Sequence, residues 1–118
     1  MNSSSPRQYE LWIANLDPSL GSEPGKTRPV VILQSDILNR SGHSSTIACS
    51  ISSQPKDGVS LIRLSVEPTI SNGLVKVSYI LCDQIRAMDV SRLKERIGIL
   101  DKETIKRLTE SIKAILTL

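Results

Sequence analysis

The sequence predicts a mainly β domain that ends in helices, and three features of the chain support this. Short runs of β-branched and aromatic residues, separated by Gly, Pro and Asn turns, fill residues 9–88. The apolar spacing changes to a helical period only after residue 91. The 118 residues suffice for one core, with no internal repeat and no βαβ alternation. We therefore expect a small, strongly bent antiparallel sheet or barrel with helices on one side, formed by residues 8–118 behind a disordered polar tail of residues 1–7.

Three strands are predicted in the first half of the chain, at residues 9–15, 28–34 and 45–51. The first is rich in aromatic and β-branched residues and stops at Asp17-Pro18. The second is a short β-branched run with Pro29 at its start, where no ladder donor is lost, which is typical of a central strand. Polar or Gly- and Pro-rich segments connect these runs, and we expect exposed loops at residues 19–27 and 36–44.

The second half predicts further strands and then two helices. The strand-like runs are residues 59–64, 74–77, 79–82 and 85–88, of which the last two form either one strand or two. From Ser91 onward, Leu93, Ile97 and Leu100 share one helical face, which predicts a short helix that Gly98 ends. A second helix follows Asp101 as its N-cap, and its apolar stripe consists of Ile105, Leu108, Ile112, Ile115 and Leu116.

Composition limits the partners and the compartment. The net charge is +3, and the excess of Lys and Arg lies wholly in residues 60–118. This balance is compatible with a nucleic acid partner, although the solvated faces of two helices explain the same basic residues. Those residues are Arg92, Lys94, Arg96, Lys102, Lys106 and Arg107. With no Phe, one Trp and two Tyr, the chain lacks the repeated stacking platforms of many single-strand binders. No apolar run is long enough to span a membrane, and residues 1–6 do not resemble a secretion signal, so we expect a cytoplasmic protein.

Missing motifs exclude several kinds of chemistry. The chain contains no GxGxxG, P-loop, HExxH or CxxC pattern. Cys49 and Cys82 are 33 residues apart and are predicted to be buried free thiols. His43 is the only histidine, which excludes a two-histidine nuclease, and we expect it to be an exposed loop residue. Asp17, Asp36, Asp83 and Asp89 lie beside turns or strand ends, where carboxylates usually act as caps. The sequence therefore predicts neither a metal site nor a cofactor.

Residues 21–29 place a guanidinium where a Gly- and Pro-rich loop meets a buried strand. Arg28 at this point can donate two charge-assisted hydrogen bonds to a phosphate. A fixed cation is also what a developing phosphorane dianion needs during phosphoryl transfer. The alternative is a surface arginine that pairs with Glu23 or with a carbonyl group, and local composition alone favours this alternative.

Five motifs along the chain favour the phosphate-binding interpretation of Arg28 over the surface arginine. They are Glu10-Leu11-Trp12, Leu16-Asp17-Pro18, GSEPGKTRPVV at residues 21–31, DILNR at residues 36–40 and DQIR at residues 83–86. Together they closely resemble the MazF/PemK-like toxins of bacterial toxin–antitoxin systems, and the similarity runs from about Tyr9 to the last helix. The resemblance implies an SH3-like (CcdB/PemK-like) barrel that forms homodimers. It also implies that the protein cuts single-stranded RNA, namely mRNA, at a short sequence without a metal ion and is neutralised by a MazE-like antitoxin.

Carried over position by position, the family's essential arginine falls on Arg28 and the acidic residue of its loop on Glu23. Its catalytic threonine falls on Ser52. This departure keeps the hydroxyl but loses the methyl group that restricts χ1, so we expect a less rigidly aimed hydroxyl. Whether Ser53 shares the role is left open. A second departure is Tyr9, which stands where the family commonly has glycine; we expect it to narrow the entrance of the site or to offer a stacking face.

The resemblance also implies the reaction. The ribose 2′-oxygen attacks its own 3′ phosphate and leaves a 2′,3′-cyclic phosphate and a 5′-hydroxyl, so DNA is not a substrate. Arg28 is expected to hold the nonbridging oxygens and Ser52 to add a hydrogen bond, while no residue is an obvious general base. Base recognition is expected from polar residues of the loop and of strand ends, each of which is otherwise a solvated turn residue. These are Glu23, Lys26, Asn39, Ser53, Gln54, Gln84 and Arg86.

Two other functions compete with this interpretation. The first is a non-enzymatic barrel toxin of the gyrase-inhibitor (CcdB-like) type. That group engages gyrase through a C-terminal Trp-Gly-Ile, whereas this chain ends in Leu116-Thr117-Leu118, which disfavours it. The second is a catalytically inactive interaction barrel, which the serine at position 52 makes conceivable. The sequence therefore favours an endoribonuclease toxin.

Overall fold

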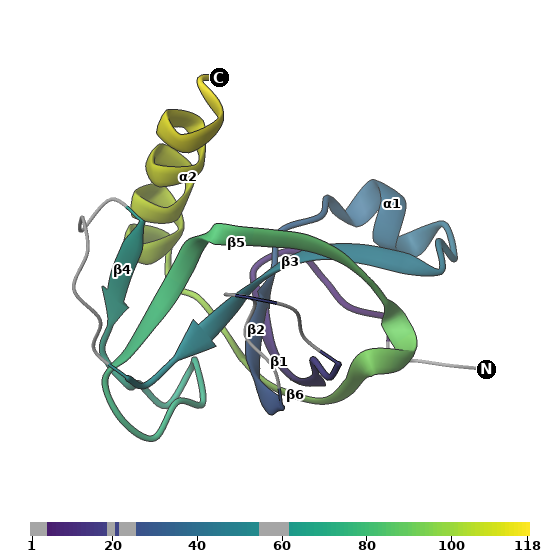
Figure 1. Cartoon of the computed structure of the whole chain (residues 1–118), viewed down its shortest axis with the longest axis horizontal. Helices are drawn as coiled ribbons and strands as arrows, with labels where there is room; N and C mark the ends of the chain where they lie inside the picture. The colour runs from purple at the N-terminus through teal and green to yellow at the C-terminus, as the bar shows by residue number, and fades with distance from the viewer. Residues whose placement is uncertain (1–4, 19–20, 22–25, 55–61) are drawn as a thin grey trace.

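The computed structural model describes residues 5–18, 21, 26–54 and 62–118. Within these residues, six strands, two α-helices and one 3₁₀ turn follow one another in the chain. They are β1 (Glu10–Asn15), β2 (Thr27–Ile32), α1 (Asp36–Arg40), β3 (Ser45–Ser52), β4 (Arg63–Val66), β5 (Ser78–Asp89), η1 (Val90–Arg92), β6 (Leu93–Ile99) and α2 (Lys102–Leu116). The strands form one antiparallel sheet in the order β4-β5-β3-β2-β1-β6. The sheet curves strongly, as Figure 1 shows, so the predicted mainly β fold is confirmed.

The curvature is concentrated in β5, which pairs with β3 along most of its length and with β4 at its beginning. The β3–β5 register shifts between Cys49 and Ile51, where β5 contains several extra residues. Such a bulge bends the strand and increases its twist. The runs predicted at residues 79–82 and 85–88 are therefore one continuous, bent strand.

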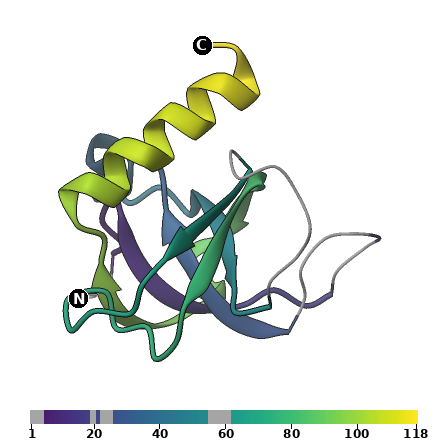
Figure 2. The same cartoon turned by 90° about the vertical axis from the view of Figure 1, so that its left-hand side faces the viewer.

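Side chains on the two faces of this sheet form two cores. On β2, Val31 belongs to the first core, and Val30 and Ile32 belong to the second, as strand alternation requires. The first core lies under α2, which contributes Leu108 and contacts β5 and β4. Figure 2 shows this helix crossing one face of the sheet. The second core lies within the curve of the sheet and consists of Trp12, Ala14, Leu16, Val30, Ile32, Ala48 and Met88.

The prediction of a helix that starts at Ser91 is wrong. The chain makes only the turn η1 there and continues as β6, which pairs with β1 at the edge of the sheet. Leu93 packs against the second core and Ile97 against the first, so these residues face opposite sides of the sheet rather than one side of a helix. Two register shifts in the β1–β6 pairing disturb the simple alternation of a strand. Pairing with β1 thus outweighs the local apolar spacing.

Three further segments differ from the sequence prediction. Residues 74–77 are a loop, not a strand. The strand predicted at residues 59–64 is β4, which begins at Arg63, and residues 59–61 lie outside the described residues. The polar segment after Gln34 contains the short helix α1. Of the predicted polar tail, residues 1–4 lie outside the described part, and Pro6 is buried.

The C-terminal helix is confirmed with its predicted N-cap. Asp101 has extended backbone angles, and its carboxylate accepts a hydrogen bond from the Thr104 N–H at 2.8 Å. In the described part of the chain, α2 is the one helix that follows the strands, where two had been predicted. No helix among the described residues has both the length and the apolarity that crossing a bilayer requires.

Two arginines of the C-terminal third are engaged within the fold rather than simply solvated. The Arg96 Nε donates to Glu10 Oε2 at 2.7 Å, and the other oxygen of this buried carboxylate accepts from the Trp12 indole at 2.9 Å. Arg92 donates to the carbonyl oxygens of Asn15 and Asp17 at 3.0 and 2.7 Å. These contacts tie η1 and β6 to β1. The lysines of the same region, Lys94, Lys102 and Lys106, are exposed as predicted.

The two cysteines are buried free thiols, as predicted. Burial raises the pKa of the Cys49 thiol well above its ordinary range, and proximity to Cys82 raises it further. Burial also raises the pKa of Cys82. Both side chains belong to the first core, and they act there as small apolar groups.

Replacement of Asp101 by Ala is expected to lower the free energy of unfolding by about 1 kcal/mol, because the Thr104 N–H loses its acceptor. Hydrogen bonds from the side chain and backbone of Thr104 lower the pKa of Asp101. The stabilisation is therefore complete above the ordinary pKa of an aspartate and is lost as the pH falls through the lowered value. Urea unfolding at neutral and acidic pH measures both effects. Asp101→Asn, which keeps an acceptor, is the control; equal stability of Asp101→Ala and wild type at neutral pH would contradict the assignment.

Candidate active site

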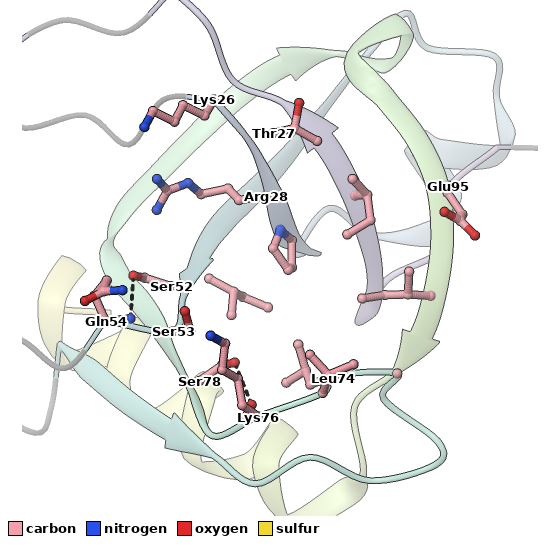
Figure 3. Close-up of a pocket in the computed structure, with 16 residues that line it drawn as sticks. Lys26, Thr27, Arg28, Ser52, Ser53, Gln54, Leu74, Lys76, Ser78 and Glu95 are labelled. Carbon is pink, nitrogen blue, oxygen red and sulfur yellow. Dashed lines mark hydrogen bonds between the residues drawn. The ribbon is translucent and has the colours of Figure 1, made fainter.

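A cleft of about 580 Å³ opens where β2 begins and β3 ends. One wall carries Lys26, Thr27 and Arg28, and a second wall carries residues 52–54, as Figure 3 shows. The loop before β5, residues 73–76, and Ser78 at the start of β5 form the opposite side. The volume lies within the range of roughly 300–1,000 Å³ that is usual for ligand sites.

Arg28 lies near the start of β2 and Ser52 at the end of β3, on two strands that are neighbours in the sheet. β2 and β3 are antiparallel, with Val30 opposite Ser50. Arg28 and Ser52 each lie two residues beyond this last pair, where β2 and β3 are no longer paired and the cleft opens between them. Both residues line the cleft, Arg28 half-buried and Ser52 6% exposed. The structure therefore brings together the two residues that the sequence predicted to be catalytic.

The Ser52 hydroxyl is held in place by its neighbour. Its Oγ accepts a hydrogen bond from the Gln54 N–H at 3.1 Å, which is drawn in Figure 3. This contact restricts the rotation that the missing methyl group of threonine would otherwise restrict. Because Oγ serves as acceptor here, its own proton stays available for donation to a phosphate oxygen. The expected looseness of the serine is thus offset by the turn that follows β3.

Lys26 has an unusual backbone at the edge of the cleft. Its φ is 64°, in the left-handed region that favours glycine. The surrounding chain fixes this conformation, because the Lys26 N–H donates to Asp17 Oδ1 and the Lys26 carbonyl accepts from the Leu16 N–H at 2.8 Å. The side chain is exposed. An exposed residue held at positive φ next to a candidate site is a pattern that indicates a functional constraint.

The other predicted base-reading residues divide into two groups. Ser53 and Gln54 line the cleft beside Ser52. Gln84 and Arg86 are half-buried on β5 and do not line it, and the Arg86 Nη1 is buried without a hydrogen-bond partner among the described residues. Glu23 lies outside the described residues.

Asn39 is not brought to the cleft. It is 4% exposed, and its amide nitrogen donates to the Gln34 carbonyl at 2.9 Å. Its amide oxygen accepts from the side chains of Gln34 and Thr46 at 3.0 and 3.1 Å. The amide therefore joins α1 to the ends of β2 and β3, which is a structural role in place of the predicted contact with RNA.

Tyr9 also has a role different from the expected one. Its ring packs against the first core, and it does not line the cleft, so it neither narrows the entrance nor offers a stacking face there. Its φ of 70° lies in the left-handed region. This backbone explains why glycine suits the position, since only glycine adopts it without a steric cost.

Several residues of the cleft were missed by the sequence analysis. Lys76 comes from the loop that was predicted to be a strand, Ser78 from the first position of β5, and Glu95 from the segment predicted to be a helix. The floor is apolar and includes Ile13 and Pro29. The Asn72-Gly73 turn was the one sequence signal for the loop, but it gave no indication of which strand the loop packs against.

Among the described residues, no three His, Cys, Asp or Glu side chains gather in a way that could hold a metal ion. His43 is exposed in the turn before β3, as predicted, with its ring 3.4 Å from the Ser45 hydroxyl. Asp89 is the N-cap of η1, and hydrogen bonds from Ser91 lower its pKa, in agreement with the capping role expected for this residue.

Comparison with known proteins agrees with this arrangement. The family described as the PemK-like, MazF-like toxin of type II toxin-antitoxin systems matches residues 7–116. The chain belongs to this family. Its relatives include endoribonuclease EndoA of Bacillus subtilis, 32% identical over 112 residues that cover 95% of each chain. Endoribonuclease MazF of Staphylococcus saprophyticus is 35% identical over 107 residues, which cover 90% of this chain and 87% of the relative.

Solved structures of MazF proteins share the fold of this PemK/MazF-like chain. MazF of Deinococcus radiodurans superimposes with a TM-score of 0.81 at 22% identity, covering 97% of this chain and 98% of the other. The MazE-MazF complex of the same organism gives a TM-score of 0.75 at 21% identity, with 97% of each chain covered. The family match is to the PemK/MazF-like toxins rather than to the gyrase-inhibitor type.

The positive φ of Lys26 gives a direct stability test. Lys26→Gly is expected to be more stable than Lys26→Ala by about 1 kcal/mol, because both remove the exposed side chain and only glycine relieves the left-handed strain. Urea unfolding of the two variants and the wild type measures the difference. Equal stability of the two variants would show that the backbone at this position is not strained.

Proposed function

We propose that this protein cleaves single-stranded RNA by attack of a ribose 2′-oxygen on the adjacent phosphate, without a metal ion, at the cleft that contains Arg28 and Ser52. As a PemK/MazF-like family member with relatives named endoribonucleases, the protein is an endoribonuclease. The observation that carries the proposal is the position of a guanidinium and a hydroxyl on paired strands of one open cleft. The proposed products are a 2′,3′-cyclic phosphate and a 5′-hydroxyl.

Arg28 has the central role in the proposed reaction. The attack places additional negative charge on the nonbridging phosphate oxygens, and a preorganised cation stabilises that charge more than it stabilises the ground state. Arginine stays protonated at neutral pH, so this role is electrostatic and not that of a general base. The half-buried position of Arg28 keeps its charge in an environment more apolar than water, where it acts more strongly.

Ser52 supplements the guanidinium with a hydrogen bond. Its Oγ is anchored by the Gln54 N–H, so the hydroxyl proton can be directed at one phosphate oxygen. A neutral hydrogen bond contributes less than a charge, about 1 kcal/mol. Ser52 is therefore a secondary contributor to the reaction, and no residue is assigned as the general base.

The substrate is proposed to be unpaired RNA. The 2′-hydroxyl is the nucleophile, which excludes DNA, and bases must be unpaired for their edges to be read. Lys26, Ser53 and Gln54 line the cleft and are the proposed contacts to the bases. Glu23 keeps this proposed role, while Gln84 and Arg86 on β5 are half-buried and are not among the residues that line the cleft.

The partners and the location are part of the same proposal. The structural relatives include a MazE-MazF complex, and another is an endoribonuclease with its cognate antitoxin. We accordingly propose a MazE-like antitoxin and a homodimer for this protein. A cytoplasmic location follows from the proposed substrate, since mRNA is found there.

Arg28→Ala is expected to keep the fold and to lose at least about 100-fold in RNA cleavage, the size typical for loss of a charge-stabilising donor. The measurement is digestion of a long RNA in EDTA, with fragment ends mapped by sequencing and unfolding followed in parallel. Arg40→Ala, on the exposed face of α1, is the matched control and should cleave as wild type does. Full activity of Arg28→Ala would overturn the assignment, and loss of wild-type cleavage in EDTA would contradict metal independence.

Two substitutions of Ser52 test separately the effect of its hydroxyl and the effect of the methyl group that a threonine would add. Ser52→Ala is expected to lower kcat about fivefold, corresponding to one neutral hydrogen bond of about 1 kcal/mol. Ser52→Thr should stay within a few-fold of wild type, because the Gln54 contact already orients the oxygen. Single-turnover cleavage of one RNA by the three proteins gives these values. A large gain in Ser52→Thr would show instead that the serine is poorly aimed.

A further inference from the structure

The side of the cleft opposite Arg28, called here the far wall, is formed by the loop between β4 and β5, and side-chain hydrogen bonds hold this loop in place. Asn72, which is 4% exposed, organises it with a single side chain. The Asn72 amide oxygen accepts from the N–H groups of Thr69 and Leu74 at 3.0 and 2.9 Å, and its amide nitrogen donates to the Glu67 carbonyl at 2.9 Å. The loop between β4 and β5 therefore has side-chain hydrogen bonds in place of a ladder partner.

Two glycines allow the backbone of this loop to pack directly against β6. Gly73 has a φ of 72°, and a Cβ there would collide with the backbone of Ile97. Gly98 approaches as closely from the other side, since its Cβ would collide with the backbone of Ser71 and Asn72. The wall and the edge strand are in backbone contact, so the position of the wall relative to β1 and β2 is fixed by the sheet.

Lys76 extends from this wall. Its carbonyl accepts from the Ser78 hydroxyl at 2.9 Å, and Ser78 is buried, so the backbone that carries Lys76 is fixed. Its side chain is exposed and makes no ion pair with any described residue. In Figure 3 the side chain is directed into the cleft on the side of Ser53, across from the wall that carries Arg28.

The cleft combines basic and apolar lining residues. Among the described residues the lining includes three basic side chains, from Lys26, Arg28 and Lys76, and one acidic residue, Glu95, whose carboxylate is directed away from the cleft in Figure 3. The lining also includes five apolar residues, called here the apolar floor, which are Ile13, Pro29, Ile51, Leu74 and Ile97. A single-stranded polynucleotide offers matching groups, because an anionic phosphate lies on each side of a flat, apolar base face.

We propose that Lys76 binds the RNA phosphate next to the one held by Arg28, with the intervening base seated on the apolar floor. This inference rests on the proposed ribonuclease function and adds a substrate-binding residue to it. A lysine ammonium is a mobile point charge, unlike the bidentate guanidinium fork. Lys76 therefore contributes to binding equally in the ground state and the transition state, which lowers KM without changing kcat.

The test compares Lys76→Gln, Lys76→Arg and the matched control Lys106→Gln, which removes an exposed lysine on α2. Binding is measured with an RNA that contains the mapped cut site and carries 2′-O-methyl groups throughout, so that no nucleophile is present. Loss of one phosphate contact should weaken binding about fivefold near 0.1 M salt and reduce the slope of log K against log salt by about 0.7. Lys76→Arg and Lys106→Gln should bind as wild type does.

Cleavage kinetics on the unmodified RNA complete the test. Lys76→Gln should raise KM about fivefold and leave kcat within twofold of wild type. Wild-type affinity and salt slope in Lys76→Gln, or a loss confined to kcat, would overturn the role of Lys76 while leaving the proposed function intact. A wild-type protein that neither binds nor cleaves RNA would contradict both proposals.

Discussion

The antiparallel register of β2 and β3 is the constraint on which the site depends. It aligns the start of β2 with the end of β3, so that Arg28 and Ser52 line one cleft, and a slip of one residue would move one of the two side chains to the other face of the sheet. The two cores prevent that slip. Val31 and Cys49 must face the first core while Val30 and Ala48 face the second, and the side chains of both cores are buried. Ordinary apolar packing thus specifies where Arg28 and Ser52 lie.

The remaining parts of the site are held by polar contacts at the strand ends. The Gln54 N–H fixes the Ser52 oxygen, and the backbone around Lys26 is fixed by Asp17 and Leu16. The opposite wall is organised by Asn72 and seated on β6. Each wall is positioned before any substrate arrives, so little ordering remains when RNA binds.

The sequence was informative where local pattern and tertiary environment agree. β1, β2 and β3 have β-branched alternation, and α2 has a cap and an apolar stripe, so each was predictable. The family resemblance predicted one site for Arg28 and Ser52, and both residues line the cleft. β6 was not, because Leu93 and Ile97 fit a helical spacing, and only pairing with β1 makes them a strand. The same error hid the cleft, since Lys76 and Glu95 reach it only after β6 and the Asn72 loop have packed together.

Asn39 shows a related limit. A polar residue in a polar segment is predicted to be exposed. Asn39 is buried instead because its side chain hydrogen-bonds to Gln34 and Thr46, which come close to each other only in the folded sheet. The basic composition was also a poor guide to the RNA surface. Arg92 and Arg96 contribute to it, yet both donate hydrogen bonds to other groups of the protein. Net charge therefore says less about an RNA surface than the few cations that a cleft leaves accessible.

Tyr9 connects parts of the molecule that are far apart in sequence. Its N–H donates to the Ile32 carbonyl at 2.7 Å, and its carbonyl accepts from the Leu100 N–H at 3.0 Å. One residue with a left-handed backbone thus joins the end of β2 to the start of the C-terminal helix. The ring's contacts offset a steric penalty of roughly 1–2 kcal/mol. A packed tyrosine thus stands at a position whose backbone favours glycine. The stability of this corner therefore depends on the residues that contact the ring, and substitutions of those residues would leave the steric penalty uncompensated.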